Sequence, residues 1–303
     1  MKKSKSAGEA QNKNAASLRA GQKLRGADGF EEYYSSLYGE RWPALKAALL
    51  KESKPLPLVC FAGAPQYFLD AASVLAAITL PLQGAKNILD MCAAPGGKSL
   101  ALASRMDSDA SLLCNERSFE RGQRLRRVIA EHLPQDVQSR VQFLCGDGAV
   151  MCKKQEAVYD AILLDAPCSS ERHVLNDPKY LADWSPARVK SLAMQQWALL
   201  SSAYRLLKDG GFLLYSTCAL DPTENAGVAA RLLKKFPQAR AVSLEEVLAL
   251  QETGKKEIGG FFDAAALPKF EAQELGFSIL PDAQDGAGPI YFCLFNKGMD
   301  KNS

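Results

Sequence analysis

The chain contains little histidine and no long hydrophobic run. His132 and His173 are its only histidines, and no two of its eight cysteines have the C-x-x-C spacing. The usual ligand sets for zinc are therefore missing, and we expect no metal site. No segment approaches about 18 uninterrupted apolar residues, so a membrane-spanning helix is excluded and no membrane partner is expected.

An export signal is also missing, because no apolar segment follows the basic N-terminus. A disulfide framework is unusual in a chain of 303 residues without such a signal, so we expect reduced thiols and a cytoplasmic protein. We take a monomer as the expected state. Cysteines in apolar, strand-like runs are expected to be small core residues. These are Cys60, Cys114, Cys145 and Cys293.

The composition is that of a globular protein, with 47% apolar and 23% charged residues, which excludes a fibrous or wholly disordered chain. The net charge of +3 is unevenly distributed, because residues 1–26 carry seven basic side chains and one acidic one. We interpret residues 1–28 as a basic, disordered tail. Such a tail either lies near a polyanion through counterion release or is merely solvated.

Two regions follow the tail. Residues 29–83 are expected to form a mainly helical extension, interrupted by prolines at 55, 57 and 65. From residue 84 onward, short apolar runs alternate with amphipathic segments of helical length, which is typical of a parallel, doubly wound sheet. Strands are expected at 87–91, 111–114, 141–145, 159–165 and 211–217. Helices are expected at about 98–105, 118–132, 186–207 and 223–236. A closing antiparallel pair is expected at 277–280 and 290–295.

Chemically active residues follow the expected strands. Ligands of a doubly wound sheet bind beyond the carboxyl ends of its strands. Four acidic residues, two cysteines and a glycine-rich loop over 92–98 occupy such positions, so we expect them at one edge of the sheet. The acidic residues are Asp90, Glu116, Asp147 and Asp165, and the cysteines are Cys168 and Cys218.

The glycine-rich loop allows two interpretations. Gly97-Lys98-Ser99 is similar to the end of a phosphate-binding P-loop, and Asp165 would then hold Mg²⁺. However, Cys92 stands where that motif needs its first glycine, and Pro95 lacks a backbone N–H. A P-loop NTPase is therefore the alternative.

The acidic residues favour a different ligand. Glu116 lies 26 positions after Asp90, near the offset of about 20 at which a carboxylate holds ribose hydroxyls. Asp147, in a Gly-Asp-Gly turn, is suited to an adenine amine. Together they suggest a nucleoside cofactor. S-adenosylmethionine fits better than NAD or ATP, because its sulfonium is positively charged and several carboxylates are close.

Three motifs carry a family resemblance. They are L-D-M-C-A-A-P-G-G-K-S at 89–99, D-A-P-C-S at 165–169 and Y-S-T-C-A-L-D-P-T-E-N at 215–225. These motifs resemble the RNA 5-methylcytosine methyltransferases of the RsmB/Nop/Sun family, and the likeness covers roughly residues 29–297. Residues 30–43 and 167–173 are similar to the compact branch that includes the mitochondrial ribosomal-RNA enzyme.

The resemblance implies a Rossmann-like class I methyltransferase domain at 84–298, with RNA binding by the extension at 29–83. The implied reaction is methyl transfer from S-adenosylmethionine to carbon 5 of a cytosine in RNA. Ribosomal RNA is favoured over transfer RNA. The target cytosine must be single-stranded or flipped out of a helix. A non-catalytic RNA-binding assembly factor on the same fold remains a further alternative.

The resemblance also implies roles for individual residues. Cys218 would be the nucleophile that forms a covalent cysteine–cytosine intermediate, and Cys168 would help to release the product. Asp165 would lie between the cofactor and the base, with Lys98 contacting the base or orienting Asp165. Glu116 would hold the ribose, Asp147 the adenine, and Arg121 would assist at the cofactor. The methionine part of the cofactor would be wrapped by Cys92, Ala93, Ala94, Pro95, Gly96, Gly97 and Lys98.

Residues outside these motifs are also candidates for RNA contact. The expected helix after Glu116 carries five arginines, which either take phosphates or form a solvated face. Arg172 and His173 are further candidates, whereas Trp184 is interpreted as a packing residue. The five arginines are Arg117, Arg121, Arg124, Arg126 and Arg127.

Overall fold

The computed structural model describes residues 24–52, 55–258, 263–283 and 286–298. Within these residues the centre of the fold is a sheet of nine strands, with the order β5-β4-β3-β6-β7-β11-β10-β9 and with β8 paired to β11. The first five strands of this order are parallel: β5 (Val141–Leu144), β4 (Ser111–Asn115), β3 (Asn87–Asp90), β6 (Tyr159–Asp165) and β7 (Leu207–Thr217). The others pair antiparallel: β8 (Ala239–Ala241), β9 (Glu271–Ala272), β10 (Phe277–Ile279) and β11 (Ile290–Lys297).

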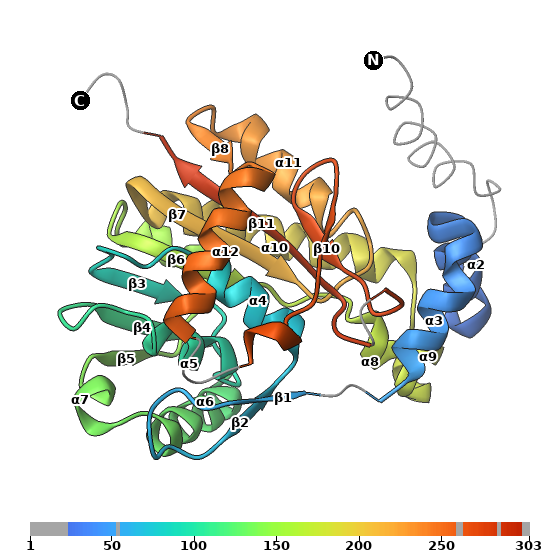
Figure 1. The fold of residues 1–303 in the computed structure, drawn as a ribbon. Coiled ribbons are helices and arrows are strands. Elements are labelled where there is room, and N and C mark those ends of the chain that lie inside the picture. Colours follow the sequence, from blue (N-terminus) through green and yellow to red (C-terminus); the bar gives the residue numbers. More distant parts are fainter. Residues whose placement is uncertain (1–23, 53–54, 259–262, 284–285, 299–303) are drawn as a thin grey trace.

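Helices cover both faces of the sheet (Figure 1). The side chains of β6 point alternately to the two faces of the sheet, and both faces are apolar. Ala161 and Leu163 belong to one buried cluster, and Ile162 and Leu164 belong to the other. The first cluster contains residues of α4 (Ala71–Thr79), α5 (Gly97–Ala103), α6 (Phe119–His132) and α12 (Leu244–Ile258). The second contains residues of α10 (Pro186–Leu206) and α11 (Ala226–Lys235). The expected doubly wound α/β fold with a closing antiparallel pair is therefore confirmed.

Some boundaries differ from the sequence prediction. Strand β7 begins at Leu207 rather than at 211, because the chain leaves α10 directly into the sheet. Helix α11 begins at Ala226 rather than at 223, because residues 222–225 form a turn in which the Gly227 N–H bonds to the Pro222 carbonyl (2.8 Å). Helix α12 was not anticipated.

The segment 29–83 contains mostly helices, as expected, but it also contains a hairpin that the sequence did not predict. It begins with α2 (Gly26–Tyr38), the 3₁₀ turn η1 (Gly39–Arg41) and α3 (Trp42–Leu50), and then forms a hairpin of β1 (Leu56–Leu58) and β2 (Tyr67–Leu69). All nine residues of α4 are buried, and α4 packs against the central sheet. Hydrophobic runs as short as β1 and β2 do not distinguish a strand from a helix, which explains why the hairpin was not predicted.

Helices α2 and α3 build a separate aromatic cluster with the α8 (Glu171–Asn176) and α9 (Pro178–Ala182) segment, at one side of the molecule (Figure 1). Trp184 is 1% exposed within this cluster, so its assignment as a packing residue is confirmed. The expected tail lies largely outside the described residues. Its boundary at 28 falls inside α2, which begins at Gly26.

The cysteine predictions are mostly confirmed. Cys60, Cys114 and Cys293 are buried core residues. Cys145 is exposed, so that prediction was wrong; it directly follows β5, where the chain has left the sheet.

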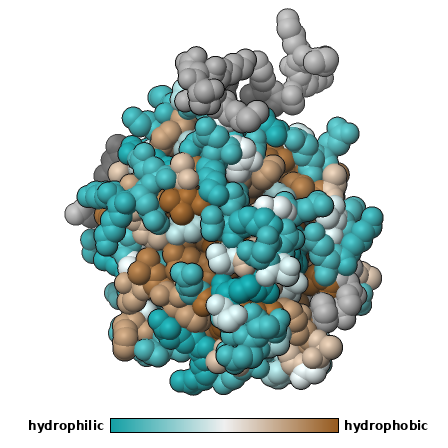
Figure 2. Space-filling view, turned by 90° about the vertical axis from the view of Figure 1, so that its left-hand side faces the viewer, coloured by the Kyte–Doolittle hydropathy of each residue, from teal (hydrophilic) through white to brown (hydrophobic). Residues whose placement is uncertain are grey.

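The described helices include none with the length and apolar character needed to cross a membrane. The surface on the left-hand side of Figure 1 is mainly hydrophilic, with smaller hydrophobic areas between the polar ones (Figure 2).

Candidate active site

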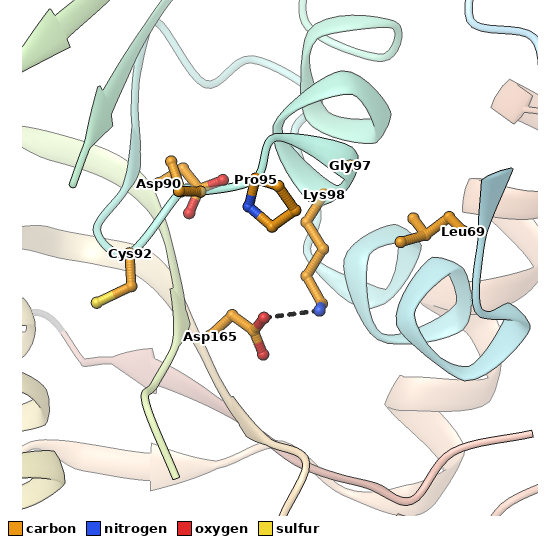
Figure 3. A pocket seen from close by; sticks show the side chains of 9 residues that line it. Leu69, Asp90, Cys92, Pro95, Gly97, Lys98 and Asp165 are labelled. Atoms are coloured by element: carbon orange, nitrogen blue, oxygen red, sulfur yellow. Dashed lines mark hydrogen bonds and ion pairs between the residues drawn. The ribbon is translucent and has the colours of Figure 1, made fainter. Parts of the chain in front are cut away.

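The four acidic residues lie at the carboxyl ends of four adjacent strands. The strand order β5-β4-β3-β6 arranges Asp147, Glu116, Asp90 and Asp165 in a row along one edge of the sheet. A pocket of about 50 Å³ opens between the last two (Figure 3). Its lining residues are Leu69, Asp90, Cys92, Ala93, Ala94, Pro95, Gly97, Lys98 and Asp165. The structure thus brings most of the expected loop together with Asp165, and it adds Asp90 and Leu69.

The glycine-rich loop is held closely by its neighbours. The Ala93 N–H donates to the carbonyl of Asn115 (2.9 Å), which ties the loop to β4. Gly96 has a φ of +119°, and a Cβ there would lie 3.0 Å from Val128 of α6. A Cβ on Gly97 would lie 2.7 Å from the Tyr67 ring of the hairpin. Glycine is therefore required at both positions, by the backbone conformation at Gly96 and by close packing at both.

Asp90 lines the pocket and is almost completely buried. Its Oδ2 accepts a hydrogen bond from Ser99 Oγ (2.6 Å), whereas its buried Oδ1 has no partner among the described residues. Burial raises the pKa of Asp90 to about 7. A buried acceptor without a partner is costly, so Oδ1 is suited to a ligand that carries a hydrogen-bond donor or a positive charge. The sequence places Asp90 at a strand end, but we did not expect it among the site residues.

Lys98 and Asp165 form an ion pair across the pocket (Figure 3). Lys98 Nζ lies 2.7 Å from Asp165 Oδ2 and 3.2 Å from Ser73 Oγ of α4. Asp165 Oδ1 accepts a hydrogen bond from Ser216 Oγ (2.9 Å). Burial alone would lower the pKa of Lys98, but the Asp165 carboxylate outweighs it and the net shift is upward. The ammonium is therefore retained, and it fixes the carboxylate in one orientation.

Glu116 and Arg121 lie beside this pocket rather than in its wall. The buried Glu116 carboxylate accepts the Ser118 N–H (2.8 Å), and Arg121 Nη1 lies 3.4 Å from its Oε2. Arg121 Nη2 also donates to the Ala94 carbonyl (2.7 Å), so this arginine connects Glu116 to the glycine-rich loop. Asp147 is exposed at the end of β5, where its Oδ1 accepts the Ala149 N–H (3.0 Å).

Cys168 and Cys218 face each other beyond the ends of β6 and β7. Their Sγ atoms lie 2.8 Å apart, and the Cys218 N–H points at Cys168 Sγ (3.3 Å). The hydrogen bond from the Cys168 thiol lowers the pKa of Cys218, although burial opposes this effect. The same bond, together with burial, raises the pKa of Cys168 well above its usual value. Cys218 is therefore the sulfur that ionises first, and a thiolate is the nucleophilic form of cysteine.

A buried carboxylate behind the cysteines was missed in the sequence. Glu224 Oε2 accepts the Ser169 N–H (3.0 Å) and a hydrogen bond from Gln196 Nε2 (2.7 Å). Burial raises the pKa of Glu224 to about 8. Glu224 belongs to one of the motifs quoted above, but only the fold brings it next to the residue that follows Cys168.

The candidates for RNA contact have different environments. Arg172 donates to the backbone carbonyls of Gly286, Gly288, Leu49 and Lys51. It therefore holds two backbone segments together, and its donors are not available to RNA. His173 is exposed and its ring lies 4.7 Å from that of Tyr180. The five arginines at and after Arg117 are all exposed. In the described ranges, no three His, Cys, Asp or Glu side chains are grouped as metal ligands would be.

Several known proteins are similar to this chain. Residues 77–285 match the profile of the 16S rRNA methyltransferase RsmB/F family. The chain is 33% identical over 234 residues to the mitochondrial tRNA (cytosine(34)-C(5))-methyltransferase of Mus musculus, covering 77% of this chain and 64% of that protein. It is 30% identical over 241 residues to the 5-cytosine rRNA methyltransferase NSUN4 of Xenopus laevis, covering 77% of this chain and 57% of that protein. The chain thus spans less than two thirds of either relative.

The fold also has solved counterparts. A methyltransferase homolog protein from Pyrococcus horikoshii matches with a TM-score of 0.65 and 20% sequence identity, over 88% of this chain and 94% of that chain. At this level of identity the likeness concerns the fold alone.

Proposed function

This chain belongs to the 16S rRNA methyltransferase RsmB/F family, and from that premise we propose that it transfers a methyl group from S-adenosylmethionine to carbon 5 of a cytosine in RNA. The observation that carries the proposal is the contact between Cys168 and Cys218 next to the charged pocket. Ribosomal RNA is the substrate class that we favour. The P-loop alternative is not favoured, because the family match includes the whole loop 92–98.

The residues around the pocket fit this cofactor. The partnerless Asp90 Oδ1 offers an acceptor to a cationic group, and the row of carboxylates suits a positively charged sulfonium. In the proposed arrangement the loop 92–98 holds the methionine part, Glu116 the ribose hydroxyls and Asp147 the adenine. Arg121 keeps Glu116 and the loop together. When bound, S-adenosylmethionine supplies an electrophilic methyl group.

Cysteine is needed because carbon 5 of cytosine is a poor nucleophile. In the proposed reaction the Cys218 thiolate forms a bond to carbon 6, and the displaced electron pair makes carbon 5 nucleophilic. Carbon 5 then takes the methyl group, and the electron pair of the S–CH3 bond that breaks stays on the cofactor sulfur, which becomes a neutral thioether. Its proton leaves to a base, the C5–C6 double bond is restored, and the C6–S bond breaks to return the thiolate. Covalent catalysis thus divides one difficult step into two easier ones.

The neighbouring residues support these steps. Asp165, held by Lys98 and Ser216, bonds to the ring nitrogen or amine of the base and stabilises charge that develops during attack. We assign Cys168 to the release step, because its sulfur is the group in contact with Cys218. It assists the removal of the carbon 5 proton, directly or through a water that it holds. The cytosine enters unpaired, since a stacked base does not expose carbon 6.

The test is methyl transfer by the full chain. Ribosomal RNA and transfer RNA, both unmodified, are incubated with tritiated S-adenosylmethionine, and the RNA is digested to nucleosides. Label in 5-methylcytidine from either RNA supports the activity, and the RNA that is labelled decides the substrate class. Label in another nucleoside, or RNA binding with no transfer to either RNA, would overturn it, and the second result would favour a non-catalytic assembly factor.

A further inference from the structure

One buried carboxylate connects the two cysteine loops. Glu171, the first residue of α8, is fully buried. Its Oε1 accepts a hydrogen bond from Ser169 Oγ (2.5 Å), and its Oε2 accepts the Leu220 N–H (2.8 Å). Ser169 directly follows Cys168, and Leu220 lies two residues after Cys218. Glu171 therefore fixes the separation of the two loops that carry the sulfur atoms.

Helix α2 reaches the same carboxylate from outside the sheet. The Tyr34 hydroxyl donates to Glu171 Oε1 (2.5 Å). Two other tyrosines of α2 bond to the loop after Cys218: Tyr33 donates to Asp221 Oδ2 (2.7 Å), and Tyr38 donates to the Leu220 carbonyl (2.7 Å). Two hydroxyls of α2 thus hold residues 220–221, and the third holds the carboxylate that accepts the Leu220 N–H.

The helix is itself rigidly anchored. Tyr34 is fully buried and stacks on Trp42, with ring centroids 5.3 Å apart and an interplanar angle of 23°. Phe30 and Trp184 complete the cluster, with their rings in edge contact at 5.2 Å. Aromatic contacts of this kind hold a ring in one orientation. The position of the Tyr34 hydroxyl is therefore set by α2, α3 and the segment before α10.

The electrostatics keep the hydroxyl as a donor. Burial, followed by the Glu171 charge, raises the pKa of Tyr34 well above its usual value, so the phenol stays protonated. Burial also raises the pKa of Glu171, while the hydrogen bonds from Ser169 and Tyr34 oppose that rise. Asp221 and Glu224, which follow β7, are the other acidic groups acting on this site.

From this geometry we propose that Tyr34 and Glu171 are positioning residues for the cysteine pair, so that helix α2 contributes to the attack on the base. The inference rests on the proposed function, because it concerns the same nucleophile. The contact between the two sulfurs favours the Cys218 thiolate, and it depends on two loops that Glu171 ties together. A displacement of about 1 Å is enough to slow a reaction substantially.

The experiment compares Tyr34→Phe, Glu171→Ala and Glu171→Gln in the full chain. Three quantities are measured: kcat for methyl transfer, the dissociation constant of S-adenosylmethionine, and the rate of Cys218 alkylation by iodoacetamide between pH 6 and 9, read by peptide mass spectrometry. We expect Tyr34→Phe and Glu171→Ala to lower kcat and the alkylation rate near pH 7 by about tenfold. Cofactor affinity should stay within about twofold of the wild type. The alkylation profile should shift to higher pH.

The conservative variant separates positioning from simple packing. The amide oxygen of Glu171→Gln still accepts the Leu220 N–H, and the hydroxyls of Tyr34 and Ser169 can turn to accept from the new amide. We therefore expect Glu171→Gln to recover most of the activity that Glu171→Ala loses. Tyr204→Phe is the matched control, because it removes a buried hydroxyl that has no partner among the described residues.

Two results would overturn the inference. One is an unchanged alkylation profile in both Tyr34→Phe and Glu171→Ala. The other is a loss of activity that only parallels a loss of folded protein or of cofactor affinity. Tyr34→Phe keeps the ring in place and so tests the idea even where Glu171→Ala fails to fold. Alkylation needs no RNA. If the wild-type protein transfers no methyl group, the proposed function is wrong, but the alkylation rates of the variants still decide whether Tyr34 positions the cysteines.

Discussion

The sulfur atoms of Cys168 and Cys218 lie 2.8 Å apart although fifty positions separate the two residues. The parallel pairing of β6 and β7 brings this about, because Asp165 is opposite Ser216 in the register. From these two residues the chain continues for three positions to Cys168 and for two positions to Cys218. The hydrogen bond between the sulfurs lowers the pKa of Cys218 and raises that of Cys168, which favours Cys218 as the attacking sulfur.

Different fates of the RNA are expected for the two cysteine variants. Cys218→Ala should abolish methyl transfer while S-adenosylmethionine still binds, because the nucleophile alone is lost. Cys168→Ala should accumulate a covalent protein–RNA complex, since release is impaired after attack. A denaturing gel with cellular RNA and S-adenosylmethionine detects the slowly migrating band. A band with Cys218→Ala alone would reverse the two assignments.

Cofactor affinity should depend on pH through Asp90. Its pKa is raised to about 7 by burial, and the ionised form is the one that attracts a cation. The affinity for the cofactor should therefore rise by at most about tenfold per pH unit up to about pH 7, and it should then level off. Calorimetry between pH 5.5 and 8.5 measures this slope. In Asp90→Asn the slope should vanish, and a slope equal to that of the wild type would rule out Asp90 as its source.

Glu116→Ala should weaken the binding of S-adenosylmethionine by about 1–3 kcal/mol, the range for hydrogen bonds to a charged group. The Glu116 carboxylate is buried beside the loop, and Arg121 already orients it. Calorimetric titration of the folded variant gives the difference. Glu120→Ala removes an exposed acid four positions further along, in the first turn of α6, and serves as the control. Equal affinity in both variants would contradict a ribose-binding role.

Lys98→Met should destabilise the protein, because it leaves the Asp165 carboxylate without its cation. We expect the free energy of unfolding to fall by about 2–3 kcal/mol. This is less than for a fully buried ion pair, because the Asp165 side chain is 32% exposed. The double variant Lys98→Met/Asp165→Asn should recover much of this loss, because no unpaired charge remains. Urea denaturation measures both. If the double variant is as unstable as the single one, the ion pair is not the cause.

Glu224 should make stability depend on pH. Burial raises its pKa in the folded state from 4.5 to about 8, so the folded protein binds the proton more tightly than the unfolded chain does. This contribution to stability is fully present below pH 4.5 and is lost as the pH rises through about 8. Urea denaturation at pH 5.5 and 8.5 should show a smaller fall in the free energy of unfolding for Glu224→Gln than for the wild type. An identical fall in both proteins would exclude this contribution.

Much of the fold followed from local patterns. Apolar runs such as 159–165 predicted the parallel strands, because a strand buried on both faces must be apolar throughout. The hairpin of β1 and β2 was missed, because strands of three residues carry too little periodicity to be recognised. Cys145 was misjudged for a related reason, since the end of an apolar run does not reveal where the chain leaves the sheet.

The sequence by itself determined which residues follow the strands, and therefore that Asp90, Glu116, Asp147 and Asp165 share one edge. Side-chain chemistry and the positions of the strands along the chain are local properties, and the carboxyl ends of parallel strands lie at one edge of the sheet. Only the tertiary structure decided that Asp90 Oδ1 is left without a partner, that Glu224 lies behind Cys168, and that Tyr34 reaches Glu171 from 137 positions away. Such contacts depend on how separate elements pack, and no pattern within a single segment encodes them.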